Sequence, residues 1–198
     1  MTREQALSFL VFSVVAAATP GPSNVLLTAT GGAVGLVRGL PALVGVAAGM
    51  AAMMFLVAFG LGNVLLASPV LLQAVKWVGA AFLLWLAFKV ATARRAGAAS
   101  SGRPVGFLGA AAFQIVNPKS WLVCASAAAT FLDQKAGGAF GQAAAFGLVF
   151  LLASLPSCLP WLAFGAVLQR RLESARAFRV FSVTMGLLLA ASVIPILR

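Results

Sequence analysis

Two short polar segments that contain proline interrupt this otherwise apolar chain at positions far apart along the sequence. They are Thr19-Pro20-Gly21-Pro22-Ser23-Asn24 and Gln114-Ile115-Val116-Asn117-Pro118-Lys119. In lipid, an unpaired backbone group costs several kcal/mol, so an interrupted helix persists only where protein groups or a wet cavity satisfy the exposed backbone. Two such interruptions in matching places predict a transport site between two halves of the chain.

Each proline in these segments releases a backbone carbonyl. Proline lacks an amide hydrogen and clashes with the carbonyl four residues earlier, which loses its helical partner. The released carbonyls are those of Ala16, Ala18 and Gln114, and we expect them to accept hydrogen bonds from a substrate ammonium. The alternative is that these prolines only kink packed helices.

Three residues around the second proline of the first segment prepare the chain to resume a helix. Gly21 adds backbone freedom between the two prolines, and we expect Ser23 and Asn24 to cap the helix that restarts there. A restarted helix points the positive end of its dipole at the break, an arrangement that suits a carboxylate.

Lys119 is a cation in the middle of an apolar segment, with no acidic residue nearby in sequence. A lysine at mid-membrane costs on the order of 2.5–3.5 kcal/mol, and ionisable groups at this depth usually line a path or find a partner. We therefore expect Lys119 to bind substrate. Alternatively, its stem snorkels or its ammonium binds the carbonyls released by the first break, and the latter is compatible with a role in the site.

A further weakened helix carries Pro156 and Pro160 around Ser157 and Cys158. Prolines inside a helix remove hydrogen bonds and permit bending. We interpret Pro156, Ser157 and Pro160 as a hinge or gate, with a packing kink as the alternative.

The elements that position these residues follow from the composition. Hydrophobic residues make up 62% of 198 positions and charged residues 9%, which leaves too little polar surface for a soluble protein of this size. A spanning helix needs about 20 apolar residues. The predicted spans lie near residues 5–27, 40–63, 69–91, 106–131, 139–168 and 178–197. Their apolar runs do not alternate as barrel strands would, so the predicted fold class is an all-α polytopic membrane protein with six transmembrane helices.

The six predicted spans divide into two sets of three, and each set begins with a broken helix, the first or the fourth. Because each set is odd in number, the second enters the membrane from the opposite side, which gives inverted repeats. We expect a single transmembrane domain over residues 1–198, with repeat one at about 1–92, a linker at about 93–104 and repeat two at about 105–198.

Cations gather at the ends of the predicted spans, and their distribution predicts the orientation. With an external amino terminus, more cations fall on the cytoplasmic side than outside, so by the positive-inside rule both termini face outward. The cytoplasmic cations are Arg38, Lys89, Arg94, Arg95, Arg103, Arg170, Arg171, Arg176 and Arg179, and the external ones are Arg3, Lys76, Lys135 and Arg198. Lipid headgroups and orientation explain the net charge of +11, and no nucleic-acid partner is expected.

The first span also imitates a secretory signal peptide, with a cation, an apolar run and a small-residue run. That interpretation is disfavoured because apolar sequence resumes at Val25, beyond the supposed cleavage point, so that removal would leave half a span.

Several kinds of catalysis lack their usual groups in this sequence. Histidine is absent, and the three acidic residues, Glu4, Asp133 and Glu173, lie near span ends. Zinc hydrolysis, serine–histidine chemistry and paired-carboxylate catalysis are therefore not expected. Cys124 and Cys158 lie inside predicted spans and suggest neither a disulfide framework nor a metal site. We expect no catalytic residue, no metal and no cofactor.

Four landmarks occur in order along the chain. They are Thr19-Pro20-Gly21-Pro22, a glycine-rich second span, Lys76-Trp77-Val78-Gly79-Ala80-Ala81-Phe82-Leu83-Leu84-Trp85-Leu86 and Asn117-Pro118-Lys119. Together they resemble the LysE/RhtB family of amino-acid exporters over essentially the whole chain. The resemblance implies a bacterial inner-membrane carrier that expels amino acids or related small metabolites, driven by the proton-motive force. Its expected partners are an amino-acid substrate and the lipid bilayer.

One position departs from that family pattern. Many relatives carry an acidic residue directly after Pro-Gly-Pro, where this chain has Ser23 followed by Asn24. A proton-carrying carboxylate is therefore missing there. Small-residue spacings such as Gly31 to Gly35 and Gly45 to Gly49 permit close helix contact, and they make a homodimer a further expectation.

The expected site offers a positive centre without a matching intramembrane acid, which predicts a preference for zwitterionic or neutral amino acids over lysine or arginine. The substrate carboxylate would meet Lys119 or the amino end of a half-helix, and the ammonium would meet the released carbonyls. A channel and a structural membrane protein without transport activity are the alternatives. The predicted substrate-binding residues are Thr19, Pro20, Gly21, Pro22, Ser23, Asn24, Gln114, Asn117, Pro118 and Lys119.

Overall fold

A computed structural model describes residues 3–61, 68–92, 105–132, 138–171 and 174–194 of the chain. Within these ranges the regular structure is helical, and no strand occurs. The α-helices are α1 (Arg3–Ala18), α2 (Pro22–Val34), α3 (Leu36–Leu56), α5 (Pro69–Ala91), α6 (Phe107–Val116), α7 (Pro118–Phe131), α8 (Ala139–Arg171) and α9 (Ala175–Ala191), and a π-helical turn η1 (Val57–Leu61) follows α3. The predicted all-α fold class is confirmed for this part of the chain.

Most helices lie where the sequence predicts spans, but the first predicted span, 5–27, ends too early, because α2 continues to Val34 and α3 begins at Leu36. Some of the helices are long and apolar enough to cross a membrane. Leu36–Gly60 and Ala139–Leu168 each meet that requirement, and α1 with α2 forms a third candidate that is bent by 55°. Outward-facing apolar side chains such as Val37, Leu108 and Leu122 are exposed, as expected of a surface that contacts lipid. The arrangement as six spans in inverted repeats remains a prediction.

Some sequence-based expectations fall outside the described ranges. They are the linker at about 93–104, the far ends of the spans predicted at 40–63 and 178–197, and the charged residues Arg94, Arg95, Arg103, Asp133, Lys135, Glu173 and Arg198.

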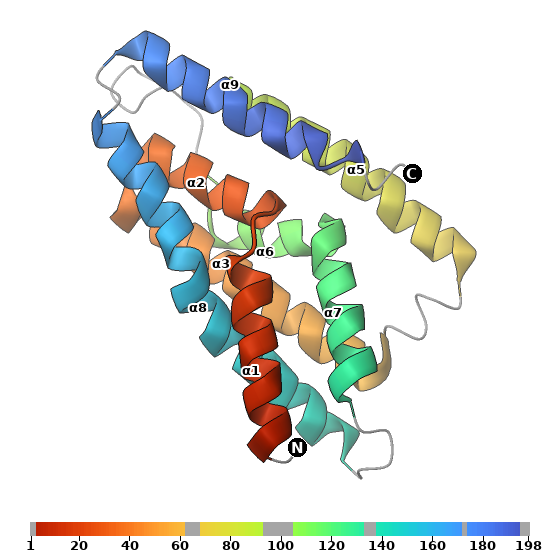
Figure 1. Ribbon diagram of the computed structural model, residues 1–198. Coiled ribbons are helices and arrows are strands. Elements are labelled where there is room, and N and C mark those ends of the chain that lie inside the picture. The colour runs from red at the N-terminus through yellow and green to blue at the C-terminus, as the bar shows by residue number, and fades with distance from the viewer. Residues whose placement is uncertain (1–2, 62–67, 93–104, 133–137, 172–173, 195–198) are drawn as a thin grey trace.

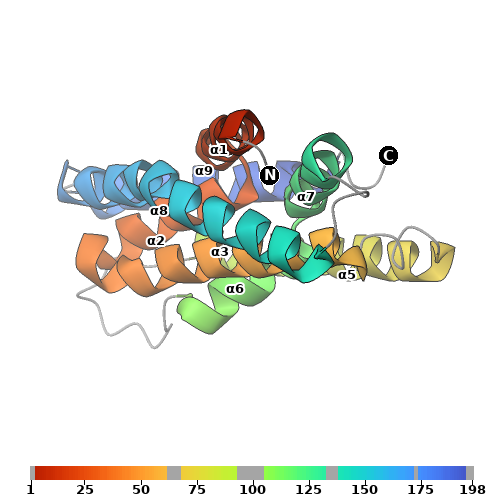
Figure 2. The same cartoon turned by 90° about the horizontal axis from the view of Figure 1, so that it is seen from below.

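The helices α3 and α8 pack against each other and form the middle layer of the bundle. Seen from below, α1 and α7 lie on one side of this layer and α6 lies on the other (Figure 2). The helices α5 and α9 lie side by side, and both are away from the lower half of the bundle (Figure 1). Chain segments from both halves of the sequence are therefore interleaved.

Glycines allow the closest helix crossings. A Cβ at Gly165 of α8 would lie 2.0 Å from the carbonyl oxygen of Thr28, and a Cβ at Gly31 of α2 would lie 2.1 Å from that of Leu162. The backbones of α2 and α8 therefore touch, as small-residue spacing permits in membrane helices. On α3, Gly45 and Gly49 contact α6 in the same way.

The first break lies between α1 and α2, where two prolines flank an extended residue. The amide of Thr19 still donates to the carbonyl of Val15, and the helix ends because Pro20 has no amide hydrogen to continue the ladder. Gly21 is extended, and Pro22 opens α2 at a position where a missing amide costs nothing.

The second break separates α6 from α7 in a similar manner. Asn117 is extended, and Pro118 is the first residue of α7. The side-chain oxygen of Asn117 accepts a 3.1 Å hydrogen bond from the amide of Lys119, which caps the new helix. Proline after a capping asparagine is a usual way to start a helix.

Candidate functional site

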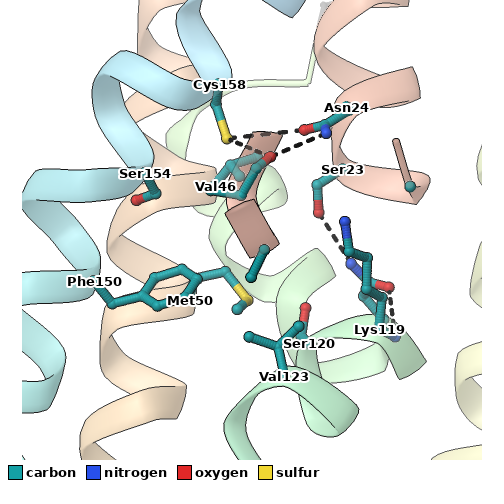
Figure 3. Close-up of a pocket in the computed structure, with 14 residues that line it drawn as sticks. Ser23, Asn24, Val46, Met50, Lys119, Ser120, Val123, Phe150, Ser154 and Cys158 are labelled. Atoms are coloured by element: carbon teal, nitrogen blue, oxygen red, sulfur yellow. Dashed lines mark hydrogen bonds between the residues drawn. The ribbon is translucent and has the colours of Figure 1, made fainter. Parts of the chain in front are cut away.

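The two breaks meet at a cavity enclosed by five helices (Figure 3). The volume open to the centre of a water molecule is about 30 Å³, room for about two waters. The cavity is therefore narrow, and an amino acid would need it to widen. The lining residues are Ala16, Ala17, Gly21, Ser23, Asn24, Val46, Met50, Asn117, Lys119, Ser120, Val123, Phe150, Ser154 and Cys158.

Lys119 joins the second break to the first. It lies in the first turn of α7, and its Nζ donates a hydrogen bond of 2.5 Å to the backbone carbonyl of Thr19. The same carbonyl accepts a 2.8 Å bond from Nδ2 of Asn24. The lysine thus binds the first break, as in the alternative, but its acceptor is the carbonyl of Thr19 and not one of the released carbonyls of Ala16 and Ala18.

Gly21 makes room for that contact. A Cβ at position 21 would lie 2.7 Å from Cδ of Lys119, closer than two such carbons can approach. Because Gly21 is extended, with φ −176° and ψ −180°, any residue type could adopt its backbone conformation. The requirement for glycine is therefore the space taken by the lysine side chain.

A network of neutral side chains provides a second link between the breaks. Oε1 of Gln114 accepts hydrogen bonds from Oγ of Ser23 at 3.0 Å and from Oγ of Ser120 at 2.9 Å. Nδ2 of Asn117 donates to Oγ of Ser23 at 3.0 Å. Gln114, Asn117 and Ser120 are buried, so each bond that is lost on movement would have to be replaced by water or substrate.

Asn24 and Cys158 cover a different part of the first break. Nδ2 of Asn24 donates to the carbonyl of Ala17 at 3.1 Å. Sγ of Cys158 lies 3.7 Å from that carbonyl and 3.8 Å from Oδ1 of Asn24. Both side chains are buried, and through them α8 contacts the break directly.

The expectation that Ser23 and Asn24 cap the second half-helix is wrong. The N-cap residue of α2 is Gly21, and no side chain caps this helix. Because α2 begins at Pro22, Ser23 and Asn24 already belong to its first turn, and their side chains point instead to Gln114 and to carbonyls of the first break. The amino end of α2 thus lacks a side-chain cap, whereas that of α7 is capped by Asn117.

Two tryptophans that the sequence did not link to the breaks supply hydrogen-bond donors there. Nε1 of Trp161 donates to the carbonyl of Ala18 at 3.2 Å, and Nε1 of Trp121 donates to that of Ile115 at 2.6 Å. The rule for proline identifies the carbonyl of Ala18 as one that loses its partner, but not that of Ile115, because the residue four positions before Pro118 is Gln114. It does not identify the new donor, which comes from a distant helix in the case of Trp161.

The predicted binding residues divide between the cavity surface and its support. Gly21, Ser23, Asn24, Asn117 and Lys119 line the cavity. The remaining predicted residues are not among the lining residues, although Thr19 supplies a carbonyl and Gln114 holds the neutral network; they are Thr19, Pro20, Pro22, Gln114 and Pro118.

The predicted hinge residues lie beside the cavity on α8 and do not line it. The helix continues through Pro156 and Pro160, and Oγ of Ser157 donates to the carbonyl of Ala153 at 2.7 Å. The lining residues of α8 are its neighbours Phe150, Ser154 and Cys158. Their spacing of four residues places them on one face of the helix, but the spacing alone does not identify them, because Phe146 continues the same series and does not line the cavity.

These features define a helical membrane protein with two broken helices around a small buried cavity. The model of the LysE type translocator family matches residues 14–193, and the chain belongs to this family. No solved structure matches the chain.

Three relatives illustrate the similarity, and each is named cysteine/O-acetylserine efflux protein. The protein of Salmonella typhimurium is 34% identical over 125 residues, which are 63% of this chain and 64% of the relative. That of Klebsiella pneumoniae is 33% identical over 132 residues, 67% of each chain. That of Escherichia coli strain K12 is 30% identical over 132 residues, 67% of this chain and 68% of the relative. The match thus spans slightly less than two thirds of the length of the Salmonella relative.

Proposed function

We propose that this chain is a secondary carrier that exports amino acids or related small metabolites across the bacterial inner membrane. The observation that carries the proposal is the cavity between the two breaks, where the ammonium of Lys119 is held by the carbonyl of Thr19. Half-helix ends and released carbonyls at a common cavity are the usual way in which transporters bind small polar substrates. Membership of the LysE type translocator family supports this class of function.

The carboxylate of a substrate would replace the Thr19 carbonyl as the partner of Lys119. A carboxylate carries a full negative charge, so its hydrogen bond to an ammonium is stronger than that of a neutral carbonyl. The uncapped amino end of α2 adds a second favourable contact for the same group. Binding would therefore open the contact that holds the two breaks together.

The ammonium of the substrate would take the acceptors that remain. When Lys119 turns to the carboxylate, the carbonyl of Thr19 loses one of its two donors, and the carbonyl of Ala17 and Oδ1 of Asn24 lie nearby. These acceptors are neutral, and no acidic side chain lines the cavity among the described residues. A second positive charge on lysine or arginine would therefore go unmatched.

The preference for neutral substrates has independent support. The relatives are named for export of cysteine and O-acetylserine, both of which carry one carboxylate, one ammonium and an uncharged side chain at neutral pH. We propose that this chain selects zwitterions of the same charge type.

The contacts between helices support two related halves within a single domain over residues 1–198. Exchange of the halves would replace α1 by α6, α2 by α7, α3 by α8 and α5 by α9. The pairs α3 with α8 and α5 with α9 are then unchanged, and the contact of α1 with α8 becomes that of α6 with α3. Both are observed contacts, whereas the extensive contact of α2 with α8 has only a small counterpart in that of α3 with α7. The two halves are therefore related only in part, and rocking about a shared site is proposed on the pairs that agree.

Movement of the halves would give alternating access, with Pro156, Ser157 and Pro160 as a hinge on α8 beside the cavity.

Both termini would face outward by the positive-inside rule. The proton-motive force would drive export. A carrier is favoured over a channel because the described cavity has room for about two waters only.

Export from loaded cells tests the function. Cells that express the chain would be loaded in turn with individual amino acids or dipeptides, and efflux would be compared with that from cells lacking it. We expect faster loss of one or more neutral amino acids. Arginine leaving faster than threonine or leucine would contradict the proposed charge preference, and unchanged efflux of all compounds would contradict the proposed function.

A further inference from the structure

The cavity has two walls of different chemistry. Ser23, Asn24 and Lys119 present polar groups from the two breaks, whereas Met50 of α3 and Phe150 of α8 form an apolar wall. In the close-up, the polar groups of Ser23 and Lys119 lie to one side, and the side chains of Met50 and Phe150 lie together on the other (Figure 3).

The apolar wall belongs to a tightly packed cluster. Met50 is 8% exposed and Phe150 is 1% exposed, and both belong to one buried cluster that also contains Phe9 and Phe146. The rings of Phe9 and Phe146 stack with centroids 4.5 Å apart. Packed interiors resist insertion of even one methylene group. Room for a substrate would therefore come from the polar wall, where binding opens the contact of Lys119 with Thr19, and the apolar wall would resist a longer side chain.

We infer that Met50 and Phe150 set the length of the substrate side chain, so that the carrier takes amino acids with short neutral side chains. The inference rests on the proposed function. If the carboxylate and ammonium occupy the polar wall, the substrate side chain has to project toward the opposite, apolar wall. Its length is then limited by the distance between Lys119 and the ends of Met50 and Phe150.

A series of straight-chain amino acids measures this limit directly. The series is alanine, 2-aminobutyrate, norvaline and norleucine, each one methylene longer than the last. One methylene in an apolar pocket changes discrimination by roughly 10- to 200-fold. We expect the unaltered chain to export the short members best and Met50→Ala to raise the ratio of norleucine to alanine export by about tenfold or more.

Matched controls separate the wall from the general effect of loosening the core. Met53 lies on the same helix and in the same cluster as Met50, is buried, and does not line the cavity. Phe146 lies on the same helix and in the same cluster as Phe150, is buried, and does not line the cavity. Met53→Ala and Phe146→Leu loosen the cluster but remove no atom that lines the cavity, so they should shift the length profile much less than Met50→Ala and Phe150→Leu do.

The experiment measures export of the series from proteoliposomes that contain each full-length variant. A much larger shift toward norleucine in Met50→Ala than in Met53→Ala supports the inference. If Met50→Ala and Met53→Ala export the series with the same length profile, the inference is wrong, and the proposed function still stands. Absence of export of every amino acid by the unaltered chain contradicts the proposed function itself. If Met50→Ala fails to insert, Phe150→Leu and Phe146→Leu give the same comparison.

Discussion

The ammonium of Lys119 donates a hydrogen bond to the backbone carbonyl of Thr19, a residue 100 positions earlier in the sequence. The donor lies at the start of one half-helix, and the acceptor lies in the break of another. A cation with a cost on the order of 2.5–3.5 kcal/mol at mid-membrane thus meets a carbonyl near a helix-breaking proline. Each group supplies what the other lacks, and we propose that a substrate carboxylate replaces the carbonyl in this contact.

Removing this charge should abolish most transport. Lys119→Met keeps the apolar stem and loses the ammonium, so the substrate carboxylate loses a charge-assisted bond worth about 1.5–3 kcal/mol, which corresponds to roughly 10- to 150-fold in rate. Export from proteoliposomes checks this. Lys89→Met is the control, because Lys89 lies over the ring of Trp85 on α5 and does not line the cavity. Full export by inserted Lys119→Met would mean that the lysine is structural.

A methyl group at position 21 should displace the lysine without disturbing the backbone. The new Cβ would lie 2.7 Å from Cδ of Lys119, the mobile part of a long side chain. We expect Gly21→Ala to insert and fold normally and to export several-fold more slowly. The matched control is Gly106→Ala, because Gly106 is an extended N-cap residue at the start of α6 and has open space around it. Equal export by both variants would contradict the importance of the Lys119 position.

A carboxylate at position 23 should alter the charge preference. Ser23 lines the cavity and accepts a hydrogen bond from Asn117, so Ser23→Asp places a negative charge where a second substrate ammonium could bind it. We expect the ratio of arginine to alanine export to rise. Ser23→Asn is the control of similar size, and it should leave that ratio low. No difference between the two variants would show that charge in the cavity does not control selection.

Backbone contact between α2 and α8 should be sensitive to a single methyl group. A Cβ at Gly165 would lie 2.0 Å from the carbonyl of Thr28, and a carbonyl in a helix cannot move aside. We expect Gly165→Ala to destabilise the protein by about 1–3 kcal/mol. Gly141→Ala is the control, because it lies on the same helix with nothing within 4 Å of the new Cβ. Thermal unfolding in detergent measures both, and equal transition temperatures would contradict the close crossing.

The positions of the breaks and the need of Lys119 for a polar partner could be predicted from sequence, because each rests on a local rule. Proline cannot continue a helix, and a charge in an apolar segment needs a partner. The first break was one of the expected partners, but the particular carbonyl, that of Thr19, does not follow from the proline rule, which points to Ala16 and Ala18. Helix boundaries were less predictable, and Ser23 and Asn24 were wrongly assigned as caps since the start of α2 was placed too late.

The apolar half of the cavity could not be predicted from sequence. Met50 and Phe150 line the cavity, but in sequence they look like the neighbouring core residues Met53 and Phe146. What distinguishes them is the packing of α3, α7 and α8 around the breaks, which depends on contacts between distant segments. The tryptophan donors were missed for a related reason, because a released carbonyl does not specify which helix will supply the hydrogen.

Counterflow in proteoliposomes is the most direct test of the claim that the cavity between the breaks carries an amino acid across the membrane. Vesicles would be loaded with unlabelled alanine, and entry of external labelled alanine would be followed for the unaltered chain and for Lys119→Met. The account predicts transient accumulation of label above its external concentration for the unaltered chain, and at least about tenfold less for the variant. Equal accumulation in both, or entry that only equilibrates, would contradict it.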